Sequence, residues 1–305
     1  MVKIIKVLRK SIHAFLHDYH SLASIAAILV FPFSAAVLSQ SLAPSSSLLT
    51  LLHSRIQMLF HAASFPASSH FFALLNLKLS QTIFSFIVTL PFTLTFLLLA
   101  KACIILIVGD FPCRRSAPPR LSSLLPLYFF LLPTHLFNYF VILSTNAAFF
   151  SILFLAFNVL DALCLSDGNI AALALPTASA ILYSIMIANT VVVCNVAAVV
   201  AATERCGGYH PFLRACVVIR GREAAAITLA VPANLGLAGV EALFQYRVVK
   251  PWWNLSRLSG SVVGEAFLIT YIHSMLVVVD VIISCMVYRS CRKSSRLGEK
   301  EILEA

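Results

Sequence analysis

Long apolar stretches recur six times along the chain, and the polar positions gather in the segments between them. Each stretch is about as long as the twenty residues that an α-helix needs to cross the hydrocarbon core of a bilayer. The pattern therefore predicts an all-α, polytopic membrane protein in which residues 1–305 form a single integral membrane domain. The six predicted spans are Leu22–Leu42, Thr82–Val108, Phe137–Asn158, Ala171–Ala202, Ala224–Phe244 and Val262–Tyr288.

Several of these spans contain a proline. Proline removes one backbone donor, but membrane helices tolerate it because neighbouring groups can satisfy the carbonyl that it frees. Simple kinks are the interpretation we favour, and a functional hinge is the alternative. The prolines concerned are Pro32, Pro91, Pro176 and Pro232.

Three segments, which precede the first, third and fifth spans, are amphipathic. Apolar residues on one helical face with basic residues beside it are typical of a helix that lies in the membrane interface. In the first segment that face is Ile5, Leu8, Ile12, Phe15 and Tyr19, and prolines interrupt the pattern of the second, Leu121–Leu132. In the third, Tyr209–Ile219, the stripe is Phe212, Ala215, Cys216 and Ile219, and Gly221 follows at the position of a helix C-cap.

Composition supports the membrane assignment. The chain is 60% hydrophobic and 11% charged, whereas a soluble domain carries about 25% charged residues. Its net charge of +10 does not indicate nucleic acid, because the basic residues lie in loops next to the spans and no soluble basic domain is present. Anionic headgroups at the cytoplasmic face are the predicted partners, alongside other membrane proteins.

The distribution of lysine and arginine predicts the orientation. Sixteen of them lie in the N-terminal segment, in the loops after the second and fourth spans, and in the basic tail 289–305. Five lie in the loops on the other side. The positive-inside rule then places both termini on the cytoplasmic side of the membrane. That membrane is predicted to be an endomembrane or the plasma membrane. Asn254, in an Asn-Leu-Ser sequon of the fifth loop, is the candidate glycosylation site on the outer side.

The segment Asn195–Arg222 carries a resemblance to a known family. It holds a span that ends in Glu204, a Gly208-Tyr209 turn, an amphipathic stretch and a basic exit, Arg220-Gly221-Arg222. In this pattern the chain resembles an uncharacterised family of plant six-span membrane proteins. That family is distantly similar to YciC-like membrane proteins and to the membrane domain associated with glycerophosphodiester phosphodiesterases. The resemblance implies a membrane fold and no reaction.

Charged residues inside the spans are candidates for function, because a central charge costs roughly 2.5–3.5 kcal/mol on insertion scales. Asp280 in the last span is the first candidate, and His273 lies seven residues earlier, so both can line one helix face. Such a pair could form a proton or ion path. The alternative is that Asp280 pairs with Lys101 of the second span, or lies near the interface.

The fourth loop supplies a second candidate site, which consists of Glu204, Arg214, Arg220 and Arg222. We favour a structural clasp in which Glu204 pairs with a loop arginine, Arg205, Arg220 or Arg222, and fixes the third amphipathic segment. The alternative is a headgroup site in which the arginines bind phosphate.

Other patterns do not build a reactive centre. His13 and Asp18 match a His-x4-Asp pattern, but no companion phosphate loop accompanies it. No CxxC spacing occurs, so we predict neither a metal site nor a cofactor. Cys285 and Cys291 stand beside basic residues at the end of the last span, where palmitoylation is an alternative to free thiols.

These observations favour a non-enzymatic, multi-pass membrane protein that organises lipids or serves partner proteins as an accessory. The alternative is a small-solute or ion transporter or channel, supported by the prolines and by Asp280 and His273. A lipid-acting enzyme is disfavoured, because no hydrolytic constellation is present.

Overall fold

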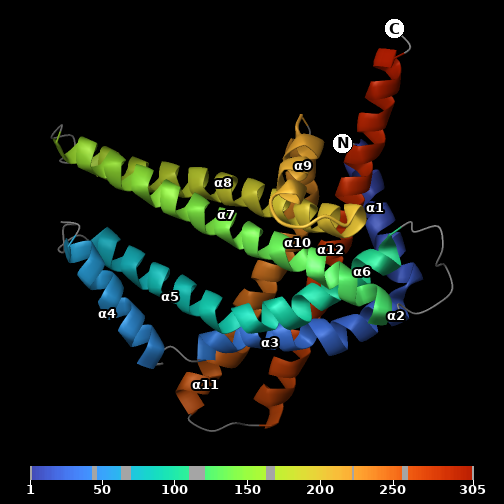
Figure 1. Cartoon of the computed structure of the whole chain (residues 1–305). Coiled ribbons are helices and arrows are strands. Elements are labelled where there is room, and N and C mark those ends of the chain that lie inside the picture. Colours follow the sequence, from blue (N-terminus) through green and yellow to red (C-terminus); the bar gives the residue numbers. More distant parts are fainter. Residues whose placement is uncertain are drawn as a thin grey trace. The chain divides into compact units, whose positions relative to one another are not determined.

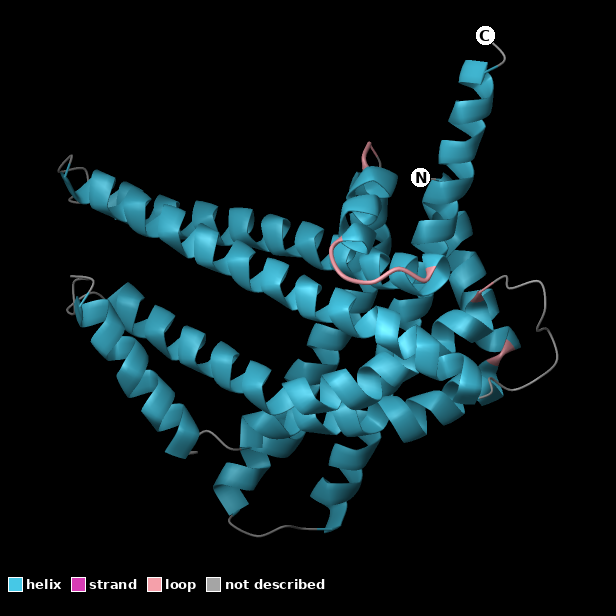
Figure 2. Cartoon of the chain, viewed as in Figure 1, coloured by secondary structure: helices cyan, strands magenta, loops and turns pink. Residues whose placement is uncertain are grey.

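The fold is helical throughout the residues that the computed structural model describes, which are 2–42, 47–62, 70–109, 121–162, 169–221, 223–255 and 260–303. Figure 2 shows the described ranges as helices with a few short loops, and these ranges contain no strand. The predicted all-α class is therefore confirmed.

Six helices within the described ranges are long and apolar enough to cross a membrane. This number equals the number of predicted spans, and it fits a multi-pass membrane protein. The helices extend beyond the predicted limits at most ends, because helical hydrogen bonding continues past the apolar stretch. They cover Tyr19–Leu42, Leu79–Val108, Leu124–Leu153, Thr177–Glu204, Ala224–Trp252 and Gly260–Arg292.

Contacts group the chain into two compact units. The first comprises Met1–Asp18, Ala102–Ala233 and Val279–Ala305, and the second comprises Tyr19–Lys101 and Asn234–Val278. Both units draw on the N-terminal and C-terminal parts of the chain, so residues that are far apart in the sequence pack within each of them.

The first unit is built on a helical hairpin. α7 (Leu121–Ala162) and α8 (Asn169–Glu204) lie side by side, and the short α9 (His210–Ile219) packs on both (Figure 1). Asn138 of α7 donates its amide Nδ2 to the carbonyl of Cys194 on α8 at 2.9 Å. Nearer the hairpin end, the Tyr183 hydroxyl donates to Asn146 Oδ1 at 2.9 Å. These two hydrogen bonds fix the register of the antiparallel pair.

The second amphipathic segment is not a separate interfacial helix. We predicted Leu121–Leu132 apart from a span beginning at Phe137, but α7 is continuous across both and holds Pro126 and Pro133 inside it. A proline removes one intrahelical hydrogen bond without ending a membrane helix when the apolar sequence continues on both sides. The third segment forms a separate helix, α9, and its place in the membrane interface stays a prediction. The first is also separate, as α1 (Val2–His17), which ends at a turn before the first span.

The second unit joins the first span and most of the second to the C-terminal part of the fifth span and the N-terminal part of the sixth. The first span runs through α2 (Tyr19–Ile25), η1 (Ala26–Val30), α3 (Phe31–Ser39) and η2 (Gln40–Leu42). The second runs through α5 (His70–Phe92), η3 (Thr93–Leu97) and α6 (Leu98–Val108). The fifth and sixth use α10 (Glu223–Phe244), η4 (Gln245–Val249), α11 (Lys250–Leu255) and α12 (Gly260–Leu303). Leu38, Phe244, Val248 and Ile269 form a buried cluster in this unit, and α3 packs on α5.

Three π-helical turns, η1, η3 and η4, accompany prolines of the described spans. Pro32 follows η1 and Pro251 follows η4, so in each case the carbonyl that the proline ring would meet four residues earlier lies inside the widened turn. η3 follows Pro91, and there the Thr95 hydroxyl donates to the Pro91 carbonyl at 2.7 Å. At each of these prolines the helix widens over one turn and then continues.

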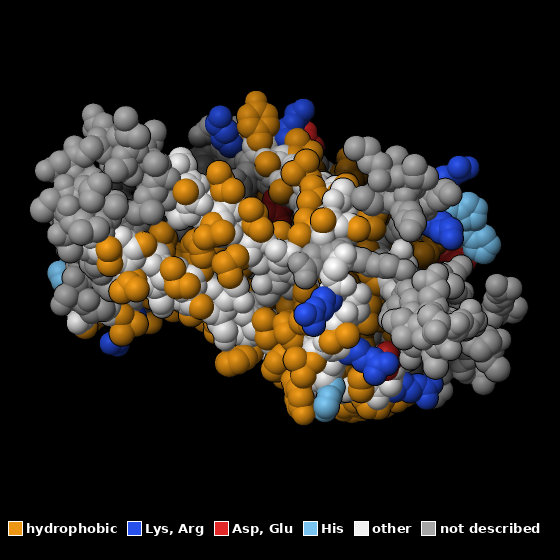
Figure 3. Space-filling model, turned by 90° about the horizontal axis from the view of Figure 1, so that it is seen from above, with side chains coloured by type: hydrophobic (Ala, Val, Ile, Leu, Met, Phe, Trp, Pro, Cys, Tyr) orange, Lys and Arg blue, Asp and Glu red, His pale blue; other side chains and the backbone are white. Residues whose placement is uncertain are grey.

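One helix was missed by the sequence analysis. α4 (Ser47–Ala62) occupies the segment between the first two spans and packs on α5, which begins at His70, well before the predicted Thr82. The consecutive polar residues His53, Ser54 and Arg55 interrupt its apolar residues, so no long apolar stretch predicts a span here. Hydrophobic side chains nevertheless dominate the described surface in Figure 3, as expected for a protein solvated by lipid.

We expect Asn138→Ala to lower the free energy of unfolding by about 1 kcal/mol, because the substitution removes a buried interhelical hydrogen bond. The matched control is Thr145→Ala on the same helix, whose hydroxyl donates only to its own turn, at the Val141 carbonyl. Reversible unfolding of the purified protein in mixed detergent micelles measures both. Equal losses in the two variants would contradict the role given to Asn138.

Candidate functional site

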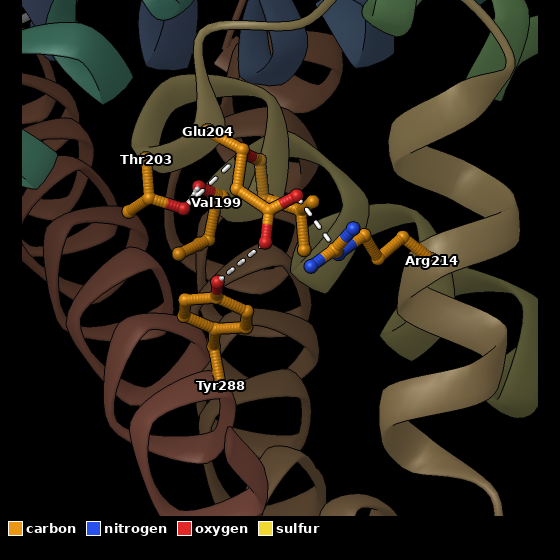
Figure 4. A network of polar contacts seen from close by, with 6 residues as sticks. Val199, Thr203, Glu204, Arg214 and Tyr288 are labelled. Carbon is orange, nitrogen blue, oxygen red and sulfur yellow. Dashed lines mark hydrogen bonds and ion pairs between the residues drawn. The ribbon is translucent and has the colours of Figure 1, made fainter. Parts of the chain in front are cut away.

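The best-defined polar site lies where α8 ends. Glu204 is the last residue of this helix, and its Oε2 lies 2.9 Å from Arg214 Nε of α9. Its Oε1 accepts a hydrogen bond of 3.2 Å from the Tyr288 hydroxyl of α12. Figure 4 shows Glu204 between these two partners, with Thr203 bonded back to Val199 within α8. One carboxylate thus joins α8 to the next helix, α9, and to the distant α12.

Backbone conformation brings α9 back to Glu204. Arg205 adopts a positive φ of 52° and Gly208 one of 83°, so the chain reverses directly after the helix. Gly207 between them lies against α7, where an added Cβ would come within 2.9 Å of Pro133 Cγ and 3.2 Å of the Phe130 carbonyl oxygen. Only glycine fits this approach without displacing α7.

Further residues of α12 bind the end of one more helix, α6, and the Tyr288 ring. Arg289 donates a guanidinium hydrogen bond to the carbonyl of Val108, the last residue of α6. Arg292 lies over the Tyr288 ring, with 5.9 Å between its guanidinium carbon and the ring centroid. Helix C-termini carry partial negative charge, and Glu204 adds a full charge to one of them. The arginines therefore offset a concentration of negative potential at this end of the first unit.

The predicted members of this site fall into three groups. Among the described arginines, Arg214, and not Arg205 or Arg220, is the ion-pair partner of Glu204. Arg220 is the exposed C-cap of α9, and its N–H donates to the Cys216 carbonyl at 3.0 Å. Gly221 follows with a φ of 78°, as the C-cap prediction requires. Arg222 lies outside the described residues. Tyr288 was missed, because nothing in the local sequence links it to Glu204.

The intramembrane candidates have partners of their own. Asp280 accepts a hydrogen bond of 3.2 Å from Asn195 Nδ2, which ties α12 to α8. His273 is buried, and its Nδ1 lies 2.9 Å from the Ser34 hydroxyl of α3. His273 belongs to the second unit and Asp280 to the first, so a path through both stays a prediction. Lys101 is half-buried in α6, and its pairing with Asp280 also stays a prediction.

Comparison with known proteins gives one result. The family described as "Domain of unknown function (DUF8558)" matches residues 1–298, almost the whole chain. The chain belongs to the DUF8558 family. Neither a curated protein nor a solved structure matches it. The predicted plant origin and the likeness to YciC-like and phosphodiesterase-associated domains therefore stay predictions.

The structure of this DUF8558 chain also shows the surroundings of its cysteines. Cys285 and Cys291 are buried, with 4% and 7% of their surface exposed, so both thiols are poorly accessible to palmitoylation. Burial raises the pKa of the Cys206 thiol beside the site. The Glu204 carboxylate raises it further, and the Arg214 guanidinium opposes both. A protonated thiol is a poor metal ligand and nucleophile. Within the described ranges, no three histidine, cysteine or acidic residues gather to hold a metal.

The remaining predicted features lie near the fifth loop. Asn254 belongs to α11, whereas Ser256 of its sequon lies outside the described residues. Glycosylation at Asn254 stays a prediction.

We expect Glu204→Ala to cost about 1–3 kcal/mol, because it leaves the buried Tyr288 hydroxyl without its carboxylate. Arg214→Ala should cost less than about 1 kcal/mol, since its side chain is 65% exposed and the ion pair is screened by solvent. Thermal unfolding at low and high salt measures both, and only the Arg214 effect should shrink with salt. A larger loss in Arg214→Ala would contradict this ranking.

We expect Gly207→Ala to destabilise the DUF8558 fold by about 1–3 kcal/mol, through overpacking against α7. Gly239→Ala in α10 is the control, because an added Cβ there meets nothing within 4 Å and alanine favours the helix. Melting temperatures of the two variants should therefore move in opposite directions. Equal melting temperatures would show that α7 yields freely at Pro133.

Proposed function

We propose that this protein is a non-enzymatic membrane organiser that binds anionic lipid headgroups through α9 and its arginines. The observation that carries the proposal is the second face of α9. Pro211, Ala215 and Ile219 are buried against the protein, as the packing of α9 on α7 and α8 requires.

The opposite face of α9 is apolar and exposed. Tyr209, Leu213 and Val217 follow one another at four-residue spacing and are 51%, 53% and 72% exposed. A helix that packs one stripe on protein and offers another apolar stripe beside basic residues suits the boundary between headgroups and acyl chains. The sequence predicts a single apolar stripe on this helix that includes Cys216, but in the structure Cys216 is exposed.

Charge on this helix suits phosphate. Arg214 uses Nε for Glu204, but its guanidinium has five N–H donors and the side chain is 65% exposed. Arg220 is exposed one and a half turns further along the chain. Near an anionic membrane surface, each basic residue contributes about 1 kcal/mol to attraction. This role also fits the predicted cytoplasmic placement of the loop, since the cytoplasmic leaflet carries the anionic lipids.

A transporter or channel is the second candidate function. Its support is the polar contacts that His273 and Asp280 make inside the spans, where polar residues line substrate paths in many membrane proteins. Flux of protons or small ions through reconstituted vesicles tests this candidate directly.

The lipid proposal is tested by native mass spectrometry of the full-length protein released from micelles that contain phosphatidylserine and phosphatidylcholine. We expect preferential phosphatidylserine adducts, reduced about tenfold or more in the double variant Arg214→Gln, Arg220→Gln. The matched control is Arg55→Gln on α4, an exposed arginine of the other unit, which should leave the adducts unchanged.

Added inorganic phosphate separates the sources of the ligand. If it displaces the lipid adducts at low millimolar concentration, the arginines bind free phosphate and not a membrane lipid. Equal retention of the two lipids by the unmodified protein would refute the proposal.

A further inference from the structure

Glu241 stands opposite a buried histidine in the second unit. His273 of α12 lies with Nδ1 2.9 Å from Ser34 Oγ of α3, and with Nε2 3.8 Å from Glu241 Oε1 of α10. His273 and Ser34 are 3% and 0% exposed, whereas half of the Glu241 side chain is exposed. Three spans therefore meet at one imidazole, and one of them supplies a carboxylate.

All three side chains lie deep within their spans. At 1.5 Å per residue, each is about 12 Å or more from both ends of its apolar helix. An isolated carboxylate at this depth is costly, and its own hydration is lost. A proton on either member of the pair removes that cost, because the pair is then neutral overall.

We propose that Glu241 and His273 form a proton-binding site within the membrane. Ser34 Oγ accepts a hydrogen bond from the Nδ1–H of His273, which leaves the Nε2 lone pair facing the carboxyl group. When Glu241 Oε1 and His273 Nε2 close from 3.8 Å to hydrogen-bond distance, a proton passes between them. The pair is then either a carboxylic acid with an imidazole or a carboxylate with an imidazolium, and no electrons move.

Few other charges act on this pair. α3 presents Ser34 to His273, and α10 presents Glu241. Arg247 follows Glu241 by six residues, in η4, and is thus about 9 Å away along the helix axis. On α12 itself, Glu265 lies eight residues before His273 and Asp280 seven residues after it. Each is thus about 10 Å or more away along the helix axis. The carboxyl and imidazole groups are therefore the groups that determine how protons bind here.

A hydrophobic carbodiimide tests the site in the full-length protein, reconstituted in liposomes. The reagent adds a protonated carboxyl group across its C=N bond, so the modified peptide reports protonated Glu241 by mass spectrometry. We expect modification of Glu241 at low pH that falls as the pH rises, and none in Glu241→Gln. In His273→Gln, the pH midpoint of this fall should rise by about one unit or more, because no imidazolium remains to stabilise the carboxylate.

Two further variants serve as a second test and as a control. Ser34→Ala should move the midpoint in the same direction by a smaller amount, since it frees the imidazole to turn. Glu265→Gln, five residues into α12, should leave both the extent and the midpoint unchanged. Circular dichroism and a single elution peak establish that each variant is folded.

Three outcomes would overturn the proposal. The first is no modification of Glu241 at any pH, and the second is a midpoint that is the same in His273→Gln and the unmodified protein. The third is equal modification by a water-soluble carbodiimide, which would place Glu241 in water and not in hydrocarbon.

Discussion

The hydrogen bonding of the backbone in hydrocarbon governs the rest of this structure. An unpaired N–H or C=O costs several kcal/mol where no water can reach it, so a chain of this composition must be helical at every depth of the membrane. Proline tests that constraint, because it removes a donor and displaces the carbonyl four residues earlier. Wider turns precede Pro32 and Pro251 and include the displaced carbonyls, and another wider turn follows Pro91. The spans therefore stay continuous through these prolines.

The same constraint reappears where helices end. The last carbonyls of a helix have no intrahelical partners, and their dipoles sum to negative charge. Arg289 meets this need at the carbonyl of Val108, the last residue of α6. At the end of α8, Arg214 and Tyr288 instead bind the side-chain carboxylate of Glu204, which adds its own negative charge there. Basic residues that the positive-inside rule counts only for orientation thus also hold helix ends together. This double use explains why the recognisable sequence pattern of the chain lies at the membrane edge and not within a span.

Much of this architecture can be predicted from the sequence, because lipid demands long apolar helices and leaves a strong signal. The number of spans, the separate α9 and the left-handed Gly221 all follow from local patterns. What could not be predicted depends on tertiary contacts or on weak periodicity. α4 has polar residues within its apolar pattern, and α7 passes through Pro126 and Pro133, where local rules favour a break. The partner of Glu204 could not be chosen among nearby arginines, since the turn at Arg205 and Gly208 decides which of them returns to it.

The intramembrane acids show why partner chemistry outweighs position. In the sequence, Asp280 and Glu241 are both acids inside predicted spans, and the predicted site combines Asp280 with His273, which precedes it by two turns. In the structure, Asp280 is bonded to the Asn195 amide, which donates a hydrogen bond but does not exchange a proton at neutral pH. Such a contact satisfies the carboxyl group and fixes two helices, and it needs no further role. Glu241 instead faces an imidazole, the side chain whose ordinary titration range lies nearest neutrality. Because both members of that pair can carry the proton, it has two neutral arrangements of nearly the same atoms, which a purely structural contact does not require.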